Sequence, residues 1–365
     1  MMNTGIYIHV PFCIKKCNYC DFASFVNGNF EEYFSCLEKE IKMYSDYLSG
    51  NTIDTIFIGG GTPSFVDYKY IGKILKLFDF NASAEVTIEC NPKTVTEDKL
   101  KAYKDFGINR ISIGMQSAND NELSLLGRAH DYADFLNTFD LVRKYGFKNV
   151  NVDVMFGIPE QTIESYTHTL NELIRLNPEH ISAYSLIIEE NTPFYSMDLS
   201  LPSEEDEREM FLLTSKLLKC YERYEISNYA KPGYECKHNI KYWSMKSFLG
   251  FGVNAYSFLN NSRYSNFSTL NEYISVVNSD KKPVKEISSE DCEELYKDAV
   301  ITGLRLSRGI DLKQIEKNFG KALYEENKEK IDKYISMGYM TLKDDYLAFT
   351  ENGFSVSNYI LSELI

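Results

Sequence analysis

The chain has 365 residues, of which 44% are hydrophobic, so it is long enough for one large domain, a smaller one and a sizeable core. Its formal net charge of −14 argues against a protein whose main partner is nucleic acid. The opening MMNTGIYIHVPF lacks the features of a secretory signal peptide, and no apolar run is long enough to span a membrane. We therefore expect a cytoplasmic protein with no integral membrane segment, which would approach a membrane only through a partner.

Short β-branched runs alternate with amphipathic segments of helical length over the first half of the chain. The predicted strands are 6–10, 54–59, 85–90, 110–115, 149–157 and 180–187. The predicted helices are 29–49, 67–79, 96–106, 119–127, 131–146 and 162–176, the third with an N-cap at Thr96 and a stop at Gly107. Six such units predict a parallel α/β sheet. Polar residues at or just after the strand ends favour a partial (β/α)6 TIM-like barrel, because parallel strand ends open onto one face. These polar positions are the cysteine loop, Gly59–Pro63, Glu89, Gln116 and Asp153.

The character of the sequence changes near residue 200. Residues 201–284 begin with an acidic helix start and continue as an aromatic-rich region without clear periodicity, which we expect to complete the core. Residues 285–365 read as helix, turn, helix and hairpin, the order of a small winged-helix-like α+β domain. No basic recognition helix occurs there, so DNA binding is not expected. We thus expect three parts, at 1–200, 201–284 and 285–365.

Three cysteines, Cys13, Cys17 and Cys20, follow the first predicted strand within eight positions. Three thiolates are one too few for a closed structural zinc site, although His9 or a remote cysteine would complete one. The alternative is a [4Fe–4S] cluster held by three cysteines, with one iron left open for another ligand. The other cysteines are scattered, and we expect each to be a buried, inert thiol: Cys36, Cys90, Cys220, Cys236 and Cys292.

A C-x-x-x-C-x-x-C loop after the first strand, followed by GGGTP after the second, resembles the radical S-adenosylmethionine superfamily. The glycine-rich turn alone also fits a phosphate loop, but no Gly-Lys-Ser/Thr follows it. The resemblance implies a cluster on the three cysteines, with S-adenosylmethionine on the open iron. It places Glu89 and Arg128 near the methionine end, and Gln116 and Asp153 near the ribose. The implied cofactor-binding set is Tyr7, Tyr19, Gly59, Gly60, Gly61, Thr62, Glu89, Gln116, Arg128 and Asp153. Taken singly, each also fits a strand-end cap or a surface salt bridge.

The segments YIHVPFC, GGGTPSF, IECNP, GMQSAND, LGRAH and DVMFGIPEQT resemble, in this order, the oxygen-independent coproporphyrinogen III oxidase family. One branch of that family oxidatively decarboxylates two propionates of coproporphyrinogen III. The other, the HemW-type heme chaperones, binds heme and passes it to client proteins. Phe22 stands where the decarboxylase branch has a fourth cysteine, and HNIKYW at 238–243 matches a signature of the chaperone branch. Both features favour the chaperone, with the decarboxylase as the alternative.

The same resemblance makes His238 the expected ligand of the heme iron, with Tyr242 and Trp243 offering flat apolar surface for the macrocycle. A histidine that is only hydrogen-bonded within an aromatic loop is the simpler alternative. Relatives carry a further histidine shortly after this motif, where this chain has Tyr256. The implied partners are heme and a client protein, with a respiratory protein expected and a homodimer allowed. No catalytic residue is assigned, and enzymatic activity stays open.

Overall fold

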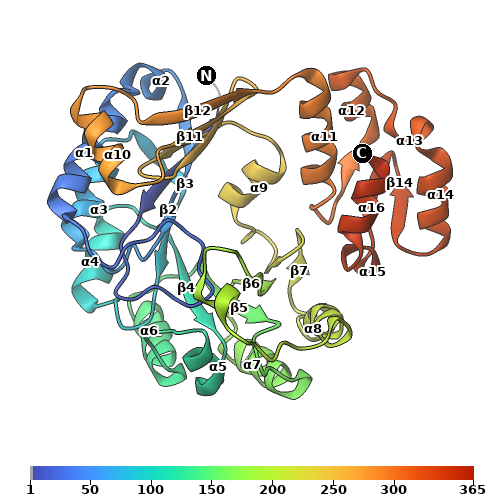
Figure 1. Cartoon of the computed structure of the whole chain (residues 1–365), viewed down its shortest axis with the longest axis horizontal. Helices are drawn as coiled ribbons and strands as arrows, with labels where there is room; N and C mark the ends of the chain where they lie inside the picture. The colour runs from blue at the N-terminus through green and yellow to red at the C-terminus, as the bar shows by residue number, and fades with distance from the viewer. Residues whose placement is uncertain (1–2) are drawn as a thin grey trace.

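A computed structural model describes residues 3–365 of the protein; Met1 and Met2, which begin the segment considered as a signal peptide, lie outside the described residues. Six parallel strands pair in chain order and form a curved, open sheet (Figure 1). They are β1 (Asn3–Val10), β2 (Thr52–Gly60), β3 (Phe80–Cys90), β4 (Arg110–Gln116), β5 (Val150–Phe156) and β6 (His180–Ser185). This arrangement confirms the predicted partial barrel of strand–helix units.

Helices follow the parallel strands and cover the outer face of the curved sheet (Figure 1). They are α1 (Phe30–Lys42), α2 (Ser45–Ser49), α3 (Tyr68–Leu75), α4 (Glu97–Asp105), α5 (Asp120–Leu125), α6 (Tyr132–Lys144) and α7 (Ile163–Leu176). The hydroxyl group of Thr96 accepts a hydrogen bond from the N–H of Lys99 and caps α4, as predicted. The single helix predicted at 29–49 is instead divided between α1 and α2, because the chain turns at Met43 and Tyr44.

The sheet extends beyond the six parallel strands on both edges, to twelve strands in all among residues 3–365. Strand β9 pairs with β1 in parallel, β10 to β12 continue antiparallel, and β8 and β7 follow β6 antiparallel. These elements are β7 (Glu222–Arg223), β8 (Asn228–Ala230), β9 (Phe248–Phe251), β10 (Tyr256–Leu259), β11 (Ser262–Asn266) and β12 (Val284–Ser289). The sequence showed no periodicity over 221–270 because its strands are only two to five residues long.

Three helices and one 3-10 turn complete this part of the chain. They are η1 (Pro193–Ser196), α8 (Glu204–Leu217), α9 (Lys237–Trp243) and α10 (Leu270–Asn278). Helix α9 lies between the two edges of the curved sheet, whereas the other helices lie outside it (Figure 1). The segment HNIKYW therefore enters the space enclosed by the strands.

Residues alternate along each parallel strand between the core and the enclosed space, as a side-chain period of two requires. In β4, Ile111, Ile113 and Met115 are fully buried in the core shared with the outer helices. The intervening residues, Arg110 and Ser112 among them, line a cavity inside the curve of the sheet. The strands thus place polar side chains on one inner surface.

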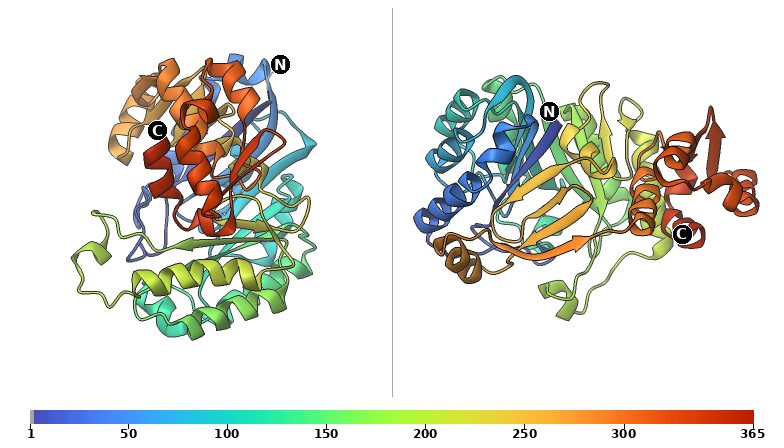
Figure 2. Two further views of the ribbon diagram at one scale, coloured as in Figure 1. Left: turned by 90° about the vertical axis from the view of Figure 1, so that its right-hand side faces the viewer. Right: turned by 90° about the horizontal axis from the view of Figure 1, so that it is seen from above.

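The C-terminal part has its own hydrophobic core and its own three-stranded antiparallel sheet, in the order β13-β15-β14 (Figure 2). Its elements are α11 (Cys292–Gly303), β13 (Ile310–Asp311), α12 (Leu312–Phe319), α13 (Leu323–Glu326), α14 (Lys328–Ser336), β14 (Met340–Lys343), β15 (Tyr346–Phe349), α15 (Glu351–Phe354) and α16 (Ser357–Leu364). The helices followed by a hairpin confirm the predicted winged-helix-like α+β appendage.

No helix within residues 3–365 has the length and apolar character needed to cross a membrane.

The scattered cysteines were all expected to be buried, which is right for Cys36, Cys90 and Cys236. It is wrong for Cys220, which lies in the turn before β7, and for Cys292, the first residue of α11, because both are exposed.

Candidate functional site

A single cavity of about 1110 Å³ lies inside the curve of the sheet and collects most of the residues expected to be functional. Its wall is formed by β1 to β6, the cysteine loop, α9 and the start of β10. Among the predicted residues, its lining includes Tyr7, Cys13, Cys17, Tyr19, Cys20, Gly60, Gly61, Thr62, Glu89, Gln116, Arg128, Asp153 and His238. Gly59 is the one predicted residue outside the lining, with Glu89 directly beside it.

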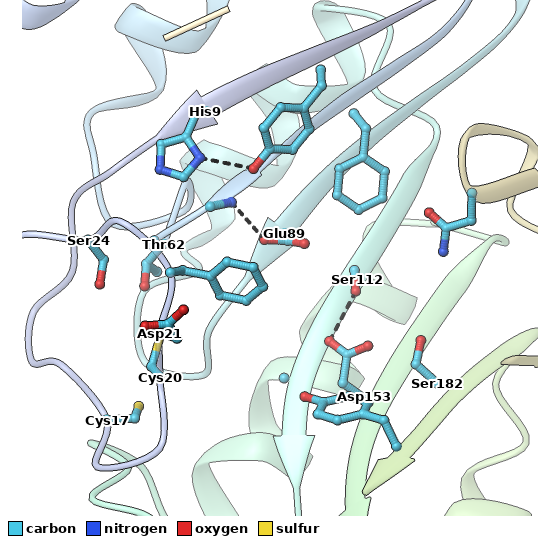
Figure 3. Close-up of a pocket in the computed structure, with 18 of the residues that line it drawn as sticks. His9, Cys17, Cys20, Asp21, Ser24, Thr62, Glu89, Ser112, Asp153 and Ser182 are labelled. Atoms are coloured by element: carbon cyan, nitrogen blue, oxygen red, sulfur yellow. Dashed lines mark hydrogen bonds between the residues drawn. The ribbon is translucent and has the colours of Figure 1, made fainter. Parts of the chain in front are cut away.

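The loop that carries the three cysteines leaves β1 and is anchored to several distant segments. The N–H of Cys13 donates to the carbonyl of Phe25 over 3.0 Å, and Asn18 donates from its amide to the carbonyl of Leu125 over 2.9 Å. Cys17 and Cys20 lie on one side of the cavity, with Asp153 across from them (Figure 3). The side chain of Phe22 is 66% exposed at the rim.

The cysteine sulfurs have neighbours that suit thiolate ligands. The hydroxyl of Thr62 donates to Sγ of Cys13 over 3.4 Å, and Nη1 of Arg128 donates to Sγ of Cys17 over 3.6 Å. Burial raises the pKa of Cys13 and of Cys20, which favours protonated thiols until a bound metal displaces the protons. Within residues 3–365 no three His, Cys, Asp or Glu side chains converge closely enough to hold a single metal ion. The loop instead spreads three thiols along one wall, beside a cation and a hydroxyl donor. These ligand types suit a multi-iron cluster, which is larger than a single metal ion.

His9 was considered as a further metal ligand, but both of its ring nitrogens are engaged. Nε2 donates to the carbonyl of Ala23 over 2.8 Å, so Nδ1 accepts the hydrogen bond from the Tyr7 hydroxyl over 3.0 Å (Figure 3). Burial lowers the pKa of His9 to about 4, which keeps its ring neutral. His9 therefore positions Tyr7 and the end of the cysteine loop.

The glycine-rich turn after β2 packs tightly against β1. Gly60 has φ of +111°, and a Cβ there would lie 2.5 Å from the His9 ring. A Cβ on Gly61 would lie 2.9 Å from the backbone of Pro11 and Phe12. Only glycine permits this approach. The turn thus fixes the start of the cysteine loop, in addition to offering bare backbone to the cavity.

Two carboxyl groups, Glu89 on β3 and Asp153 on β5, point into the cavity from either side of β4. The N–H of Gly60 donates to Oε2 of Glu89 over 3.1 Å, and Asp153 accepts from Asn151 over 2.7 Å and from Ser112 over 3.3 Å (Figure 3). Burial and the nearby Asp153 raise the pKa of Glu89 to about 8, and burial likewise raises the pKa of Asp153. Both were expected at or after strand ends; Glu89 is the penultimate residue of β3, as expected, whereas Asp153 lies in the middle of β5. They reach the cavity because every second residue of a strand faces it.

Arg128 and Gln116 are held at the mouth-side end of β4. Besides Cys17, the Arg128 guanidinium donates from Nη2 to Asn91 Oδ1 over 2.7 Å and to the carbonyl of Gly114 over 3.0 Å. Gln116 has φ of +70°, a rare left-handed conformation for this residue type, and accepts from the Tyr184 hydroxyl over 2.8 Å. Burial raises the pKa of Tyr19, which keeps this phenol neutral beside Arg128 and Cys17.

His238 lies on α9 at the inner end of the cavity and is 1% exposed. Its Nδ1 is 2.8 Å from the hydroxyl of Thr55, and its Nε2 is 2.8 Å from the hydroxyl of Tyr242. The ring stacks on Phe57 at a centroid distance of 5.4 Å. Burial lowers the pKa of His238 to about 3, so the imidazole is neutral. Both nitrogens are already occupied, and binding an iron would require one of these hydrogen bonds to open.

The cavity also contains polar residues that sequence reasoning missed. Arg110 and Ser112 on β4, Asn151 on β5, Ser182 on β6 and Asn239 on α9 line its inner part. Their signal was available, because a polar residue at every second position of an otherwise apolar strand marks an inner wall. RISIGM and NVNVDV both carry that pattern.

Comparison with known proteins identifies the family. The Radical SAM superfamily model matches residues 7–173, and the HemN C-terminal domain model matches residues 291–356. Heme chaperone HemW of Bacillus subtilis is 34% identical over 330 residues, 87% of each chain. Heme chaperone HemW of Buchnera aphidicola from Schizaphis graminum is 35% identical over 98% of this chain and 97% of its own, and that of Escherichia coli is 38% identical over 69% of each.

A solved structure described as coproporphyrinogen III oxidase (HemN) from Escherichia coli, a radical SAM enzyme, has a TM-score of 0.87. It covers 99% of this chain and 90% of that chain at 24% identity, so this likeness concerns the fold. Relatives that exceed 30% identity over most of both chains carry the stronger conclusion: this chain belongs to the HemW family of the radical SAM superfamily.

Proposed function

We propose that the protein is a heme chaperone, which binds heme in the inner cavity and delivers it to a client protein. The observation that carries this proposal is that one cavity joins the cysteine loop to the HNIKYW helix. Its volume of about 1110 Å³ exceeds the ~300–1,000 Å³ of most small-ligand sites, which leaves room for more than one group. The three curated relatives compared above are each named as a heme chaperone HemW, which supports the same assignment.

Membership of the radical SAM superfamily implies a [4Fe–4S] cluster and S-adenosylmethionine. Cys13, Cys17 and Cys20 would hold the cluster, which when bound supplies one electron to the sulfonium of S-adenosylmethionine. Arg128 would pair with the methionine carboxylate, as its guanidinium already lies beside Cys17. The remaining contacts of S-adenosylmethionine are assigned to Tyr7, Tyr19, Gly59, Gly60, Gly61, Thr62, Glu89, Gln116 and Asp153.

The proposed heme site lies between α9 and the start of β10. Tyr242 and Trp243 line the cavity there and offer apolar ring surface to a macrocycle. Tyr256 is 58% exposed at the same wall, whereas His238 is buried and bonded at both ring nitrogens. A phenol can ligate heme iron, as an imidazole can. Tyr256 is thus the ligand that needs no rearrangement, and His238 becomes available only when Tyr242 or Thr55 releases it.

An anaerobic heme titration of the cluster-reconstituted protein, followed by absorbance, tests the proposal. We expect one heme per chain in the wild type. Loss of the iron-ligand spectrum in H238A would assign the ligand to His238, and its loss in Y256F would assign it to Tyr256. Absence of stoichiometric binding in all three proteins would overturn the heme assignment. Loss of carboxylates from coproporphyrinogen III, with 5′-deoxyadenosine formed from S-adenosylmethionine, would then support the decarboxylase alternative.

A further inference from the structure

One buried arginine in the cavity has no partner. Arg110, the first residue of β4, is 2% exposed, and its guanidinium forms no hydrogen bond or ion pair with any residue in 3–365. Its Nε in particular is a buried donor without an acceptor. Arg128 on the same wall differs, since its two Nη atoms donate to three acceptors. A guanidinium stays charged in proteins, so an unpaired one in the interior calls for an anion.

The carboxyl groups near Arg110 are committed to other donors. Glu85 accepts the N–H groups of Lys237 and His238 at the start of α9, each over 3.1 Å. Asp153 accepts from Asn151 and Ser112, and Glu89 accepts from Gly60. Burial raises the pKa of Glu89 to about 8 and also raises the pKa of Asp153. The guanidinium of Arg110 therefore has no hydrogen-bonded counter-ion, and Glu85 and Asp153 act on its charge without forming an ion pair with it.

Arg110 lies at the end of the cavity away from the cysteine loop. Arg128 donates to the carbonyl of Gly114, four residues further along β4, which corresponds to roughly 13 Å at the usual rise of a strand. The charged and polar groups that act on Arg110 include Cys236, Glu85 and Tyr224, all close to the start of α9. Asn151, on the adjacent strand β5, and Asn239, on α9, line the same cavity. An anion bound by Arg110 would thus sit next to the HNIKYW helix.

We infer that Arg110 binds a carboxylate of the heme, one of the two propionates that the macrocycle carries on one edge. The planar guanidinium matches a carboxylate with two parallel hydrogen bonds. The other carboxylate available to this cavity, that of S-adenosylmethionine, belongs near Arg128 and the cysteines. This inference rests on the proposed function and adds the recognition group to it: the inner end of the cavity selects a macrocycle with free acid side chains.

The test compares heme with heme dimethyl ester, in which both propionates are blocked, on reconstituted wild type, R110Q and R110K. The control is R208Q, which removes an exposed arginine of α8. We expect the wild type and R208Q to bind heme at least about tenfold more tightly than the ester. R110Q should bind both equally and lose about tenfold in heme affinity, and R110K should fall between. Affinity for S-adenosylmethionine should not change.

Other outcomes distinguish a failure of the carboxylate site from a failure of the proposed function. If R110Q binds heme like the wild type and still discriminates against the ester, the carboxylate site is refuted while heme binding stands. If R110Q loses S-adenosylmethionine and keeps heme, the carboxylate is that of S-adenosylmethionine. If no variant binds heme, the proposed function fails and the inference with it. The ligand-free Tm gives a further check: removal of an unpaired charge should leave it unchanged or raised in R110Q, and a marked fall would indicate a structural role instead.

Discussion

Arg128 donates a hydrogen bond from Nη1 to Sγ of Cys17 over 3.6 Å, which joins the segment between α5 and α6 to the loop after β1. Arg128 is half-buried, and the other contacts of its guanidinium, to Asn91 and Gly114, fix its position. A fixed hydrogen-bond donor beside a ligand sulfur holds that sulfur in position for a metal. The cluster-binding wall of the cavity is thus prearranged around Cys17.

The first prediction concerns this cysteine. C17A should lose the [4Fe–4S] cluster, because two thiolates do not retain it during ordinary anaerobic handling. Iron content and charge-transfer absorbance after reconstitution measure the loss. C220A is the matched control, since Cys220 is exposed and is not among the residues that line the cavity, and it should keep a full complement of iron. Four irons in C17A would refute the assignment of Cys17.

The second prediction concerns Asp153. D153A should weaken binding of S-adenosylmethionine by about 1–3 kcal/mol, the usual cost when a buried polar group loses its partner. Asn151 and Ser112 donate hydrogen bonds to the Asp153 carboxyl and hold it in one orientation. D153A therefore removes an acceptor that is already positioned for the ligand. Calorimetry on reconstituted protein gives the affinity. D98A, at a side chain that is 81% exposed, is the control, and an equal affinity in D153A and D98A would remove Asp153 from the site.

The sequence predicted the first half of the fold because the hydrophobic periodicities of strands and of helices are both strong there. Strand β2, predicted at 54–59 and observed at Thr52–Gly60, and the capped helix after Thr96 carry their own signals, and neither signal depends on distant contacts. The short strands of residues 221–266 carry none: β7 has two residues and β8 three. They form only because β6 and β1 offer unpaired edges, a tertiary cause that local pattern does not contain.

The site shows the same division between local and tertiary causes. Motif spacing identified the cysteine loop, and the strand period would have identified Arg110. The state of His238 was not readable, because Thr55 on β2 and Tyr242 on α9 occupy its nitrogens only after the chain folds. The family resemblance made His238 the expected heme ligand, and that assignment stays a prediction; in the fold both of its ring nitrogens are hydrogen-bonded.

The third prediction concerns the pH dependence of stability through Glu40, a residue of α1 far from the cavity. Its carboxyl accepts from the Tyr273 hydroxyl over 2.6 Å, the Gly252 N–H over 2.8 Å and the Asn266 amide over 2.7 Å. Burial nevertheless raises the pKa of Glu40 from 4.5 to about 7. The folded chain keeps this proton where the unfolded chain has lost it, so the stabilisation is complete below pH 4.5 and is lost as pH rises to about 7.

Urea unfolding of the ligand-free protein between pH 5 and 7 measures this contribution. For one such group, the free energy of unfolding should fall by about 1.4 kcal/mol per pH unit, and E40Q should lack that part of the slope. Glu89 and Glu225, whose pKa values burial raises to about 8 and about 7, leave a remaining slope in the variant. E38Q, at a partly exposed position of the same helix, should keep the wild-type slope. A slope in E40Q equal to that of the wild type would contradict the prediction.

The fourth prediction concerns the ion pair that fastens α9 to the sheet. Nζ of Lys241 lies 2.8 Å from both carboxylate oxygens of Asp54 on β2, and the Lys241 side chain is only 5% exposed. K241M leaves Asp54 without its partner and should cost about 1–3 kcal/mol of unfolding free energy. This is below the ~3–5 kcal/mol of a fully buried pair, because a third of the Asp54 side chain is exposed.

A double-mutant cycle isolates the pair. K241M with D54N should recover part of the loss, because the uncompensated carboxylate is then gone. The pair Lys42–Glu38, with side chains 61% and 39% exposed, is the matched control and should show a coupling of about 0.5 kcal/mol or less. Since α9 carries one wall of the proposed heme site, K241M should also weaken heme binding, although Lys241 does not line the cavity. Equal coupling energies for the two pairs would mean that the buried salt bridge does not hold α9, and that packing of Tyr242 and His238 does.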